Sequence, residues 1–459
     1  MSIRRLLCTA CIAAVSAGSA FAAPTGSLER RAWIGAAVTT VAGGATVGEI
    51  TAPQADRFAG LEQGDVILEV DGKKVGPAGD ALAAIGARNP GDNGRLVVRR
   101  GGNETTLSGR YASQPVEIYA NGVAHYGVTP FEGGQLRDIL VTPPGGAMGP
   151  VVFYIQGYTC DTVEAPQDGY RQHLIDGLLA RGVSTYRIEK PGVGDSRGGA
   201  ACADIDFATE TRAFQAGYQA LRETHGVPAD RIFILGHSLG GLEAPLLAAA
   251  GPAPRGVAVY GTVVRNWRDY MLDALKYQGF MAAGADPADG EIAGERFRSL
   301  MEKIYGQGQS LTAIAAANPA DVDLLRALQW DGGERLMGRQ AAFWRQISET
   351  RLLTAWRDTR SEVLAVVGES DFAAVDAEDH KLIVDVANHY RPGSARFVSA
   401  PRTGHGMTLD GNRAEARTPR APGSRAPFND ELIPLFADWI EASMAKPAAA
   451  ATAVTQARN

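Results

Sequence analysis

The stretch Arg231-Ile232-Phe233-Ile234-Leu235-Gly236-His237-Ser238-Leu239-Gly240 contains the strongest structural signal in the chain. Its first half is a short apolar run, which predicts a buried strand, and the Ala- and Leu-rich residues 239–250 predict a helix. Gly236 and Gly240 allow the strand to turn sharply into the helix, so that Ser238 is exposed at a strained turn. A G-x-S-x-G pattern is common by chance, but here the strand and the helix that it requires are both present. We therefore interpret Ser238 as a nucleophile; the alternative is an ordinary strand–helix turn.

The pattern around this stretch alternates between strands and helices from about residue 113 onward, which predicts an α/β fold with a mostly parallel sheet covered on both faces. The expected strands are 150–156, 184–188, 231–235, 256–260, 362–368 and 396–400. The expected helices are 168–181, 207–225, 239–250, 375–390 and 428–444. The alternation stops between about 264 and 350, where the pattern is helical throughout. An insertion at this place is expected to cover the carboxyl edge of the sheet as a cap.

A serine nucleophile needs a nearby base and a group that orients the base. His405 lies in Thr403-Gly404-His405-Gly406-Met407, after the last expected strand, and its glycine neighbours allow a loop to bring the imidazole toward Ser238. Asp371 ends the loop after the strand at 362–368, whereas Asp376 and Asp379 belong by pattern to the next helix. His237 lies inside the turn around Ser238, and we expect it to pack there. The other histidines, which we expect on the surface or in the core, are His125, His173, His225, His380 and His389.

This order of nucleophile, acid and histidine resembles the α/β-hydrolase family, and the resemblance covers about residues 113–445. It implies that Ser238, Asp371 and His405 form a catalytic triad. His405 would take the proton from Ser238 and return it to the leaving group, while Asp371 would orient the imidazole and stabilise its cation. An acyl-enzyme would form and be released by water.

The same resemblance implies an oxyanion hole built from the backbone N–H groups of Leu239 and Tyr158. Tyr158 lies in Gln156-Gly157-Tyr158, where Gln156 replaces the histidine that is usual in the family.

The resemblance extends to the stretch Lys190-Pro191-Gly192-Val193-Gly194-Asp195-Ser196, which matches the family's Gly-x-Gly-x-Ser turn, a feature that is usually structural. Cys160 follows the expected oxyanion loop and Cys202 follows this turn. Because the two loops are neighbours in the family's fold, and export leads to an oxidising compartment, we expect a disulfide between these cysteines. The alternative is two separately buried thiols.

Residues 27–111 have a different pattern of short strands and turns. The most informative part is 60–72, where a Gly-Asp turn precedes alternating apolar residues and Asp71-Gly72 predicts a hairpin turn. This block resembles a bacterial PDZ domain over roughly 80 residues. The resemblance implies a carboxylate-binding loop at Trp33-Ile34-Gly35-Ala36 and a groove between the following strand and a helix near 80–87, where an extended chain end would bind by strand addition. The alternative is a docking appendage that binds no peptide.

The N-terminal residues indicate export. Arg4 and Arg5 precede a mostly apolar stretch, and Ala20-Phe21-Ala22 fits a signal peptidase site. We expect residues 1–22 to be a signal peptide and the mature protein to be periplasmic or secreted in a bacterium; the alternative is a retained membrane anchor. The tail 446–459, rich in Ala, Thr and Pro, is expected to be disordered.

Composition narrows the function classes. The formal net charge is −6 and no long basic run occurs, so binding to nucleic acid or to an anionic membrane has no electrostatic support. We expect neither a metal nor another cofactor, because no Cys/His cluster has ligand spacing and no nucleotide-binding loop follows a strand. Aromatic residues of the insertion, which would enclose an apolar group or pack in the core, are Trp267, Tyr270, Tyr277, Trp330, Phe343 and Trp344.

The leading prediction is an exported serine hydrolase that cleaves a small carboxylic ester or amide. One alternative is a serine peptidase or aminopeptidase that acts on peptides presented by the PDZ-like domain. Another is a non-catalytic binding protein that recruits partners through that domain. Haloperoxidase- or lyase-like chemistry on the same fold also stays open, since fold and triad do not fix the reaction.

Overall fold

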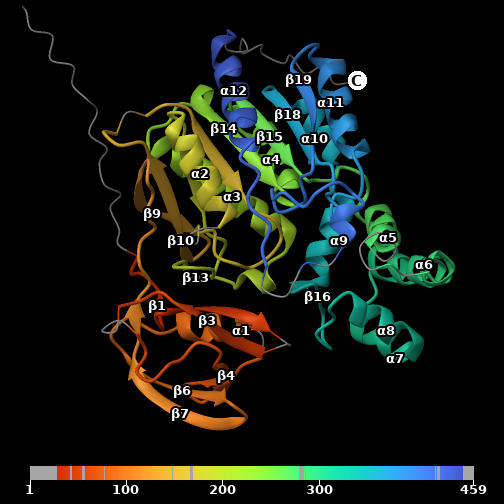
Figure 1. Ribbon diagram of the computed structural model, residues 1–459. Helices are drawn as coiled ribbons and strands as arrows, with labels where there is room; N and C mark the ends of the chain where they lie inside the picture. Colours follow the sequence, from red (N-terminus) through yellow and green to blue (C-terminus); the bar gives the residue numbers. More distant parts are fainter. Residues whose placement is uncertain are drawn as a thin grey trace, which may run out of the picture.

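The computed structural model describes residues 28–41, 44–53, 57–76, 78–146, 148–165, 169–278, 284, 286–418, 420 and 424–447. The expected signal peptide and most of the expected tail therefore lie outside the described residues. The described chain forms a β-rich N-terminal domain and a larger α/β domain; in Figure 1 the N-terminal domain, in red and orange, lies below the α/β domain.

The N-terminal domain is an antiparallel sheet with one helix. In order across the sheet its strands are β2 (Ala36–Val41), β3 (Gly44–Ile50), β4 (Val66–Val70), β6 (Asn93–Arg100) and β7 (Asn103–Arg110), with β5 (Lys73–Lys74) paired to β4. Helix α1 (Ala78–Gly86) packs against β2, β3 and β4 through its small apolar face. The short pair β1 (Ala32–Trp33) and β8 (Ala112–Ser113) joins the two ends of the domain.

Local sequence explains most of this domain. Asp71 and Gly72 both have positive φ, 47° and 87°, as the predicted Asp-Gly hairpin turn requires. Strand β7 was not predicted, because its residues are polar and Leu107 is its one buried apolar side chain. It forms as an edge strand by pairing along the whole length of β6.

The α/β domain has a nine-stranded sheet. Across the sheet the strands are β9 (Val123–Phe131), β10 (Gly134–Thr142), β12 (Ser184–Ile188), β11 (Val151–Ile155), β14 (Ile232–His237), β15 (Gly256–Tyr260), β18 (Glu362–Gly368) and β19 (Ala395–Ala400), and the short β13 (Arg197–Gly198) pairs with β10. The strands from β12 to β19 are parallel, and β9 and β10 add an antiparallel edge. The predicted parallel sheet is confirmed.

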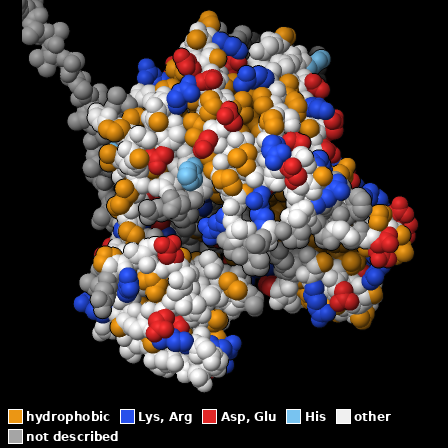
Figure 2. Space-filling view, viewed as in Figure 1, with side chains coloured by type: hydrophobic (Ala, Val, Ile, Leu, Met, Phe, Trp, Pro, Cys, Tyr) orange, Lys and Arg blue, Asp and Glu red, His pale blue; other side chains and the backbone are white. Residues whose placement is uncertain are grey.

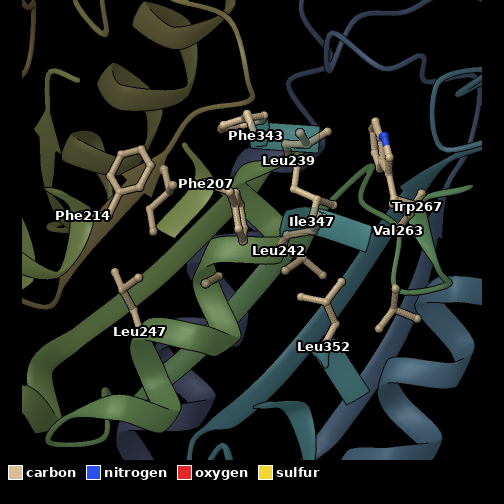
Figure 3. Close-up of a cluster of buried hydrophobic side chains, with 14 of the residues drawn as sticks. Phe207, Phe214, Leu239, Leu242, Leu247, Val263, Trp267, Phe343, Ile347 and Leu352 are labelled. Carbon is tan, nitrogen blue, oxygen red and sulfur yellow. The ribbon is translucent and has the colours of Figure 1, made fainter. Parts of the chain in front are cut away.

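Successive side chains of a strand point to opposite faces of the sheet, and in the central strands the side chains on both faces are apolar. Both faces are therefore covered by helices. On one face α3 (Phe207–Glu223), α4 (Gly240–Ala250), α10 (Leu352–Asp358) and α11 (Glu378–Tyr390) pack on alternate residues such as Ile234 and Val259. Figure 3 shows part of this core, with Leu242 and Leu247 of α4 near Phe207 and Leu352. On the other face α2 (Tyr170–Ala180) and α12 (Leu432–Ala445) pack on the intervening residues, including Phe233 and Leu235.

A mainly helical insertion separates β15 from β18. Its elements are α5 (Trp267–Tyr277), α6 (Pro287–Met301), the π-helix η5 (Glu302–Gly306), α7 (Leu311–Ala317), α8 (Pro319–Ala327), the hairpin β16 (Arg335–Leu336) and β17 (Arg339–Gln340), and α9 (Ala341–Glu349). The remaining short helices are η2 (Cys202–Asp204), η3 (Ala229–Arg231) and η6 (Glu415–Arg417). In Figure 1 the insertion lies at the same lower edge of the sheet as β13.

Charged side chains of both signs are mixed on the face of the molecule drawn in Figure 2. Figure 2 shows acidic and basic side chains interspersed over this face, without a broad area of one sign.

Candidate active site

Ser238 lies on the sharp turn between β14 and α4, with a φ of 56°. The two glycines of the pentapeptide make this turn possible. A Cβ on Gly236 would lie 2.3 Å from the carbonyl oxygen of Gly240, and a Cβ on Gly240 would lie 2.1 Å from that of Ile155. The backbone N–H of Ser238 donates to the carbonyl of Tyr260 (2.9 Å) and so holds the turn against β15.

Ser238, His405 and Asp371 meet in one hydrogen-bonded row. His405 Nε2 lies 3.0 Å from Ser238 Oγ, and His405 Nδ1 lies 2.9 Å from Asp371 Oδ2. The three residues come from loops that follow β14, β19 and β18. These strands are parallel, with β15 between β14 and β18, so their carboxyl ends bring the three residues to one edge of the sheet. Chemically, the row can pass a proton from a serine hydroxyl to an imidazole that a carboxylate holds in place.

Asp371, rather than its acidic neighbours, contacts the histidine. Its Oδ1 accepts hydrogen bonds from the backbone N–H groups of Ala373 (2.9 Å) and Ala374 (2.8 Å), which fix the carboxylate. Asp376 and Asp379 instead pair with Arg265 at 2.9 and 2.7 Å. These two carboxylates therefore belong to a separate ion-pair cluster.

Burial and charge set the protonation of the row. Burial raises the pKa of Asp371, but the charge and hydrogen bond of His405, together with the hydrogen bond from the N–H of Ala374 and the nearby His380, outweigh it, so that this pKa is below its usual value. For His405 burial lowers the pKa, and the carboxylate of Asp371 more than offsets this and leaves it raised. The side chain of Asp371 is 0% exposed and that of His405 is 31% exposed, so a substrate can reach the imidazole but not the carboxylate.

The loop after β11 lies against Ser238. A Cβ on Gly157 would be 3.2 Å from Ser238 Cβ and 3.4 Å from its Oγ. Among the described residues, the backbone N–H groups of Tyr158 and Leu239 donate to no protein acceptor. Two N–H groups beside a serine hydroxyl suit the oxygen of a tetrahedral adduct.

A disulfide joins Cys160, two residues beyond Tyr158, to Cys202 in η2. The predicted pairing is confirmed. Glu189, which follows β12, supports the same loop by accepting hydrogen bonds from the hydroxyl of Thr162 and from the N–H of Val163 (2.8 Å). The loop that flanks Ser238 is thus held both by the disulfide and by the hydrogen bonds to Glu189.

His237 has a role that the sequence did not suggest. We expected it to pack inside the elbow, and it does so, but its ring also bonds to Tyr154 (3.1 Å) and to the backbone carbonyl of His405 (2.8 Å). No local pattern indicates this contact, because the partners are far apart in the chain.

The aromatic residues of the insertion mostly form core. Trp267, Phe343 and Trp344 are at most 3% exposed and pack with α3 and α4. Tyr158 is half-buried and lies edge-on to Trp344, with ring centroids 5.2 Å apart. Core packing therefore accounts for these three rings.

The expected carboxylate loop Trp33–Ala36 spans the bend from β1 into β2, and Gly35 has a φ of 83°. Two of its carbonyls are occupied: those of Ile34 and Gly35 accept from the N–H groups of Phe58 and Ala52, each at 3.1 Å. Strand β2 and helix α1, between which the groove is expected, follow this loop and pack against each other.

Within the described ranges, no three His, Cys, Asp or Glu side chains are grouped as a metal site would require. None of the helices in this part of the chain is both long and apolar enough to cross a membrane.

Comparison with known proteins identifies two families. A PDZ domain model matches residues 32–108, and an alpha/beta hydrolase family model matches residues 139–418. No curated protein matches the chain.

Similar solved structures include Est1E of Butyrivibrio proteoclasticus with bound ferulic acid, at 17% identity over 70% of this chain and 99% of that one, with a TM-score of 0.44. Esterase Pf2001 of Pyrococcus furiosus has 13% identity over 64% and 87%, with a TM-score of 0.41. A soluble variant of monoglyceride lipase from Saccharomyces cerevisiae in complex with a substrate analogue has 13% identity over 72% and 99%, with a TM-score of 0.42.

Proposed function

The chain belongs to the alpha/beta hydrolase family, and on that premise we propose that it hydrolyses a carboxylic ester or amide through Ser238, His405 and Asp371. One observation carries the proposal: the hydrogen-bonded row from Ser238 Oγ through both ring nitrogens of His405 to Asp371. A serine hydroxyl within 3.0 Å of a base that a buried carboxylate orients is the arrangement needed for nucleophilic catalysis.

The proposed reaction has two halves. Ser238 Oγ attacks the substrate carbonyl carbon while His405 Nε2 takes the hydroxyl proton, and the imidazolium is stabilised by Asp371. The tetrahedral intermediate collapses, the bond to the alcohol or amine breaks, and His405 gives its proton to that leaving group. Water, deprotonated by His405, then attacks the acyl-enzyme, and the acid leaves as Ser238 regains its proton.

The developing oxyanion would bind the N–H groups of Tyr158 and Leu239. Their position beside Ser238 and their lack of protein acceptors among the described residues support this role. Each such donor contributes to catalysis because it is aimed at charge that appears only in the transition state.

A fluorophosphonate probe tests the nucleophile. We expect the purified protein to be labelled at Ser238 and the Ser238→Ala variant not to be labelled. A wild-type protein that resists the probe and hydrolyses nothing would instead support the non-catalytic binding protein.

A substrate screen separates the two kinds of hydrolase. Short-chain esters are compared with aminoacyl and peptidyl amides on the same protein. We expect turnover of the esters; turnover confined to the amides would favour the peptidase alternative.

The peptidase alternative rests on the N-terminal domain. Among the described residues β2 pairs only with β3, so its other edge, beside α1, is open to an added strand. We propose that this edge binds an extended peptide. Isothermal titration with a library of short free-carboxyl peptides, and with their amidated forms as controls, tests it.

We also propose that the protein is exported. The signal-like N-terminus and the Cys160–Cys202 disulfide support export, because disulfides persist in oxidising compartments. Mass spectrometry of protein recovered from a bacterial periplasm should find a mature N-terminus after Ala22; an intact Met1 would contradict cleavage.

A further inference from the structure

Four ionisable side chains lie buried together behind the loop that flanks Ser238. They are Lys190 after β12, Glu210 in α3, Glu243 in α4 and Arg339 in β17, each at most 2% exposed. Burying charge is costly unless each charge is paired and hydrogen-bonded. The contacts of these four side chains indicate which part of the structure they hold in place.

The two cations hold consecutive backbone carbonyls of that loop. Lys190 Nζ donates to the carbonyl of Gly157 (2.7 Å), and Arg339 Nη1 donates to the carbonyl of Tyr158 (2.7 Å). Both cations pair with Glu210, Lys190 with Oε1 at 3.0 Å and Arg339 with Oε2 at 2.7 Å. One carboxylate therefore sets the positions of two cations, and the cations set the positions of two peptide groups.

Peptide geometry connects this to the proposed oxyanion hole. In a trans peptide the C=O and the following N–H point in opposite directions. When Lys190 holds the Gly157 carbonyl from behind, the N–H of Tyr158 must point away from Lys190. Gly157 itself lies close to Ser238, because a Cβ at this position would be only 3.4 Å from Ser238 Oγ.

We propose that Lys190 is a positioning residue that aims the N–H of Tyr158 at the oxyanion of the reaction. Arg339 is a second positioning residue: it holds the next peptide group through the carbonyl of Tyr158 and so keeps the loop in that orientation, and Glu210 pairs with both cations. This inference rests on the proposed function and deepens it. It also assigns a role to the hairpin β16–β17, because Arg339 brings the helical insertion into contact with the loop. Its guanidinium lies over the ring of Phe343, 3.8 Å from the centroid, which fixes it further.

The charge of the cluster suits an anionic transition state. Burial, together with the nearby Glu210, raises the pKa of Glu243 well above its usual value, which favours the neutral form of this carboxyl. Burial lowers the pKa of Lys190 to about 8 in spite of Glu210, so it is still mainly cationic at pH 7. The cations of Lys190 and Arg339 thus lie on the buried side of the loop, where positive charge favours a developing oxyanion.

Kinetics of Lys190→Met and Arg339→Met test the proposal, with Arg339→Lys as the conservative variant. The readouts are kcat and KM for a p-nitrophenyl ester, and the Ki of a trifluoromethyl ketone that forms a tetrahedral adduct with serine. We expect each Met variant to lose about 10- to 100-fold in kcat with KM changed less than about threefold. Affinity for the ketone should fall with kcat/KM, and Arg339→Lys should recover much of the loss.

Arg255→Met is the matched control. Arg255 is also a buried cation that donates to backbone carbonyls, those of Ser443 and Lys446, but these belong to the C-terminal end of α12 and the residue after it. We expect this variant to lose stability and to keep its kcat. Circular dichroism and thermal unfolding show which variants are folded, and if Lys190→Met does not fold, the two Arg339 variants decide.

The outcomes separate the inference from the function that it rests on. A folded Lys190→Met or Arg339→Met protein with wild-type kcat and wild-type ketone affinity overturns the inference, while wild-type turnover and probe labelling leave the proposed function standing. A wild-type protein that neither reacts with the fluorophosphonate nor hydrolyses any ester or amide overturns both.

Discussion

His237, the residue before the proposed nucleophile, donates a hydrogen bond from Nε2 to the backbone carbonyl of His405, the proposed base, over 2.8 Å. A carbonyl only accepts, so Nε2 carries the proton and Nδ1 accepts from the hydroxyl of Tyr154 (3.1 Å). Burial, reinforced by the charge of His405, lowers the pKa of His237 to about 3, which keeps the ring neutral. The turn that presents the nucleophile thus also holds the loop that presents the base.

Replacing this ring should impair catalysis without changing the triad. We expect His237→Ala to lower kcat by about 10- to 100-fold, because the His405 loop loses a fixed contact and small misplacements of a base are costly. The pH at which activity falls should stay the same, since Asp371 and His405 remain. Ester kinetics against pH measure both quantities.

Tyr154→Phe is the control for this prediction. It removes the hydroxyl that bonds to Nδ1 but leaves the bond from His237 to His405, so its effect on kcat should be smaller. If the two variants lose equal activity, orientation of the ring by Tyr154 matters more than the bond to the loop.

The parts of the site that sequence could predict are those with a local pattern. Ser238, Asp371 and His405 each follow an apolar strand at a place where the family's order of residues can be matched. The disulfide was predictable because the loops after β11 and β12 are neighbours in that fold.

The supporting residues have no such pattern. Arg339 contacts Tyr158 across 181 positions of the chain, and His237 contacts His405 across 168. A single sequence shows no periodicity that links residues so far apart, because the contact arises only when an insertion folds back on the sheet. Strand β7 was missed for a different reason: its polar residues form a strand because β6 offers an unpaired edge.

Asp371→Asn should reduce activity and move its pH dependence. In the wild type the carboxylate raises the pKa of His405, so kcat/KM should fall as the pH drops through that raised value and the base becomes protonated. Without the carboxylate the pKa falls, and this limb of the profile moves to lower pH. We also expect kcat to fall by about 10³- to 10⁴-fold, because the amide does not hold the ring in the productive tautomer. An unshifted acidic limb would show that Asp371 does not contact the base in solution.

Removing the disulfide should cost both stability and turnover. The bond links residues 42 positions apart, and closing a loop of that size in the unfolded chain corresponds to about 4 kcal/mol. We expect Cys160→Ala/Cys202→Ala to unfold at lower urea concentration and to have a lower kcat, because Cys160 lies two residues beyond Tyr158. Wild-type protein treated with a reductant is the control, and it should behave like the double variant. A double variant as stable as the untreated wild type would argue against the Cys160–Cys202 disulfide.

Glu189→Gln should flatten part of the dependence of stability on pH. Burial, with Glu164 nearby, raises the pKa of Glu189 from 4.5 to about 7 in the folded protein. A raised carboxyl pKa means that the folded state favours the protonated form. Its contribution to stability is therefore present below pH 4.5 and lost as the pH rises through about 7, a change of about 3 kcal/mol.

The neutral amide cannot titrate, so the difference in free energy of unfolding between variant and wild type should grow in favour of the variant from pH 5 to about 8. Urea unfolding at several pH values measures this difference. A difference that does not change with pH would mean that Glu189 is ionised throughout the range.

The junction of the two domains depends on Arg30, which precedes β1. Its guanidinium contacts the carboxylates of Glu164 and Asp195, donates to the carbonyl of Pro115 (2.8 Å) and lies over the ring of Tyr126 (4.5 Å). The side chain is 14% exposed and the side chain of Asp195 is fully buried, so these charges are poorly screened by solvent.

Arg30→Met should therefore destabilise the protein by about 2 kcal/mol. The loss stays below that for an isolated buried pair because Arg31 still pairs with Glu164, and Arg137 still donates to Asp195. Arg326→Met, which removes an exposed pair with Asp323, is the control and should change stability by less than about 0.5 kcal/mol. Because the junction is buried, the loss of stability caused by Arg30→Met should persist in about 0.5 M salt, whereas salt would screen an effect at the surface. A loss of stability that disappears in salt would mean that Arg30 is solvated.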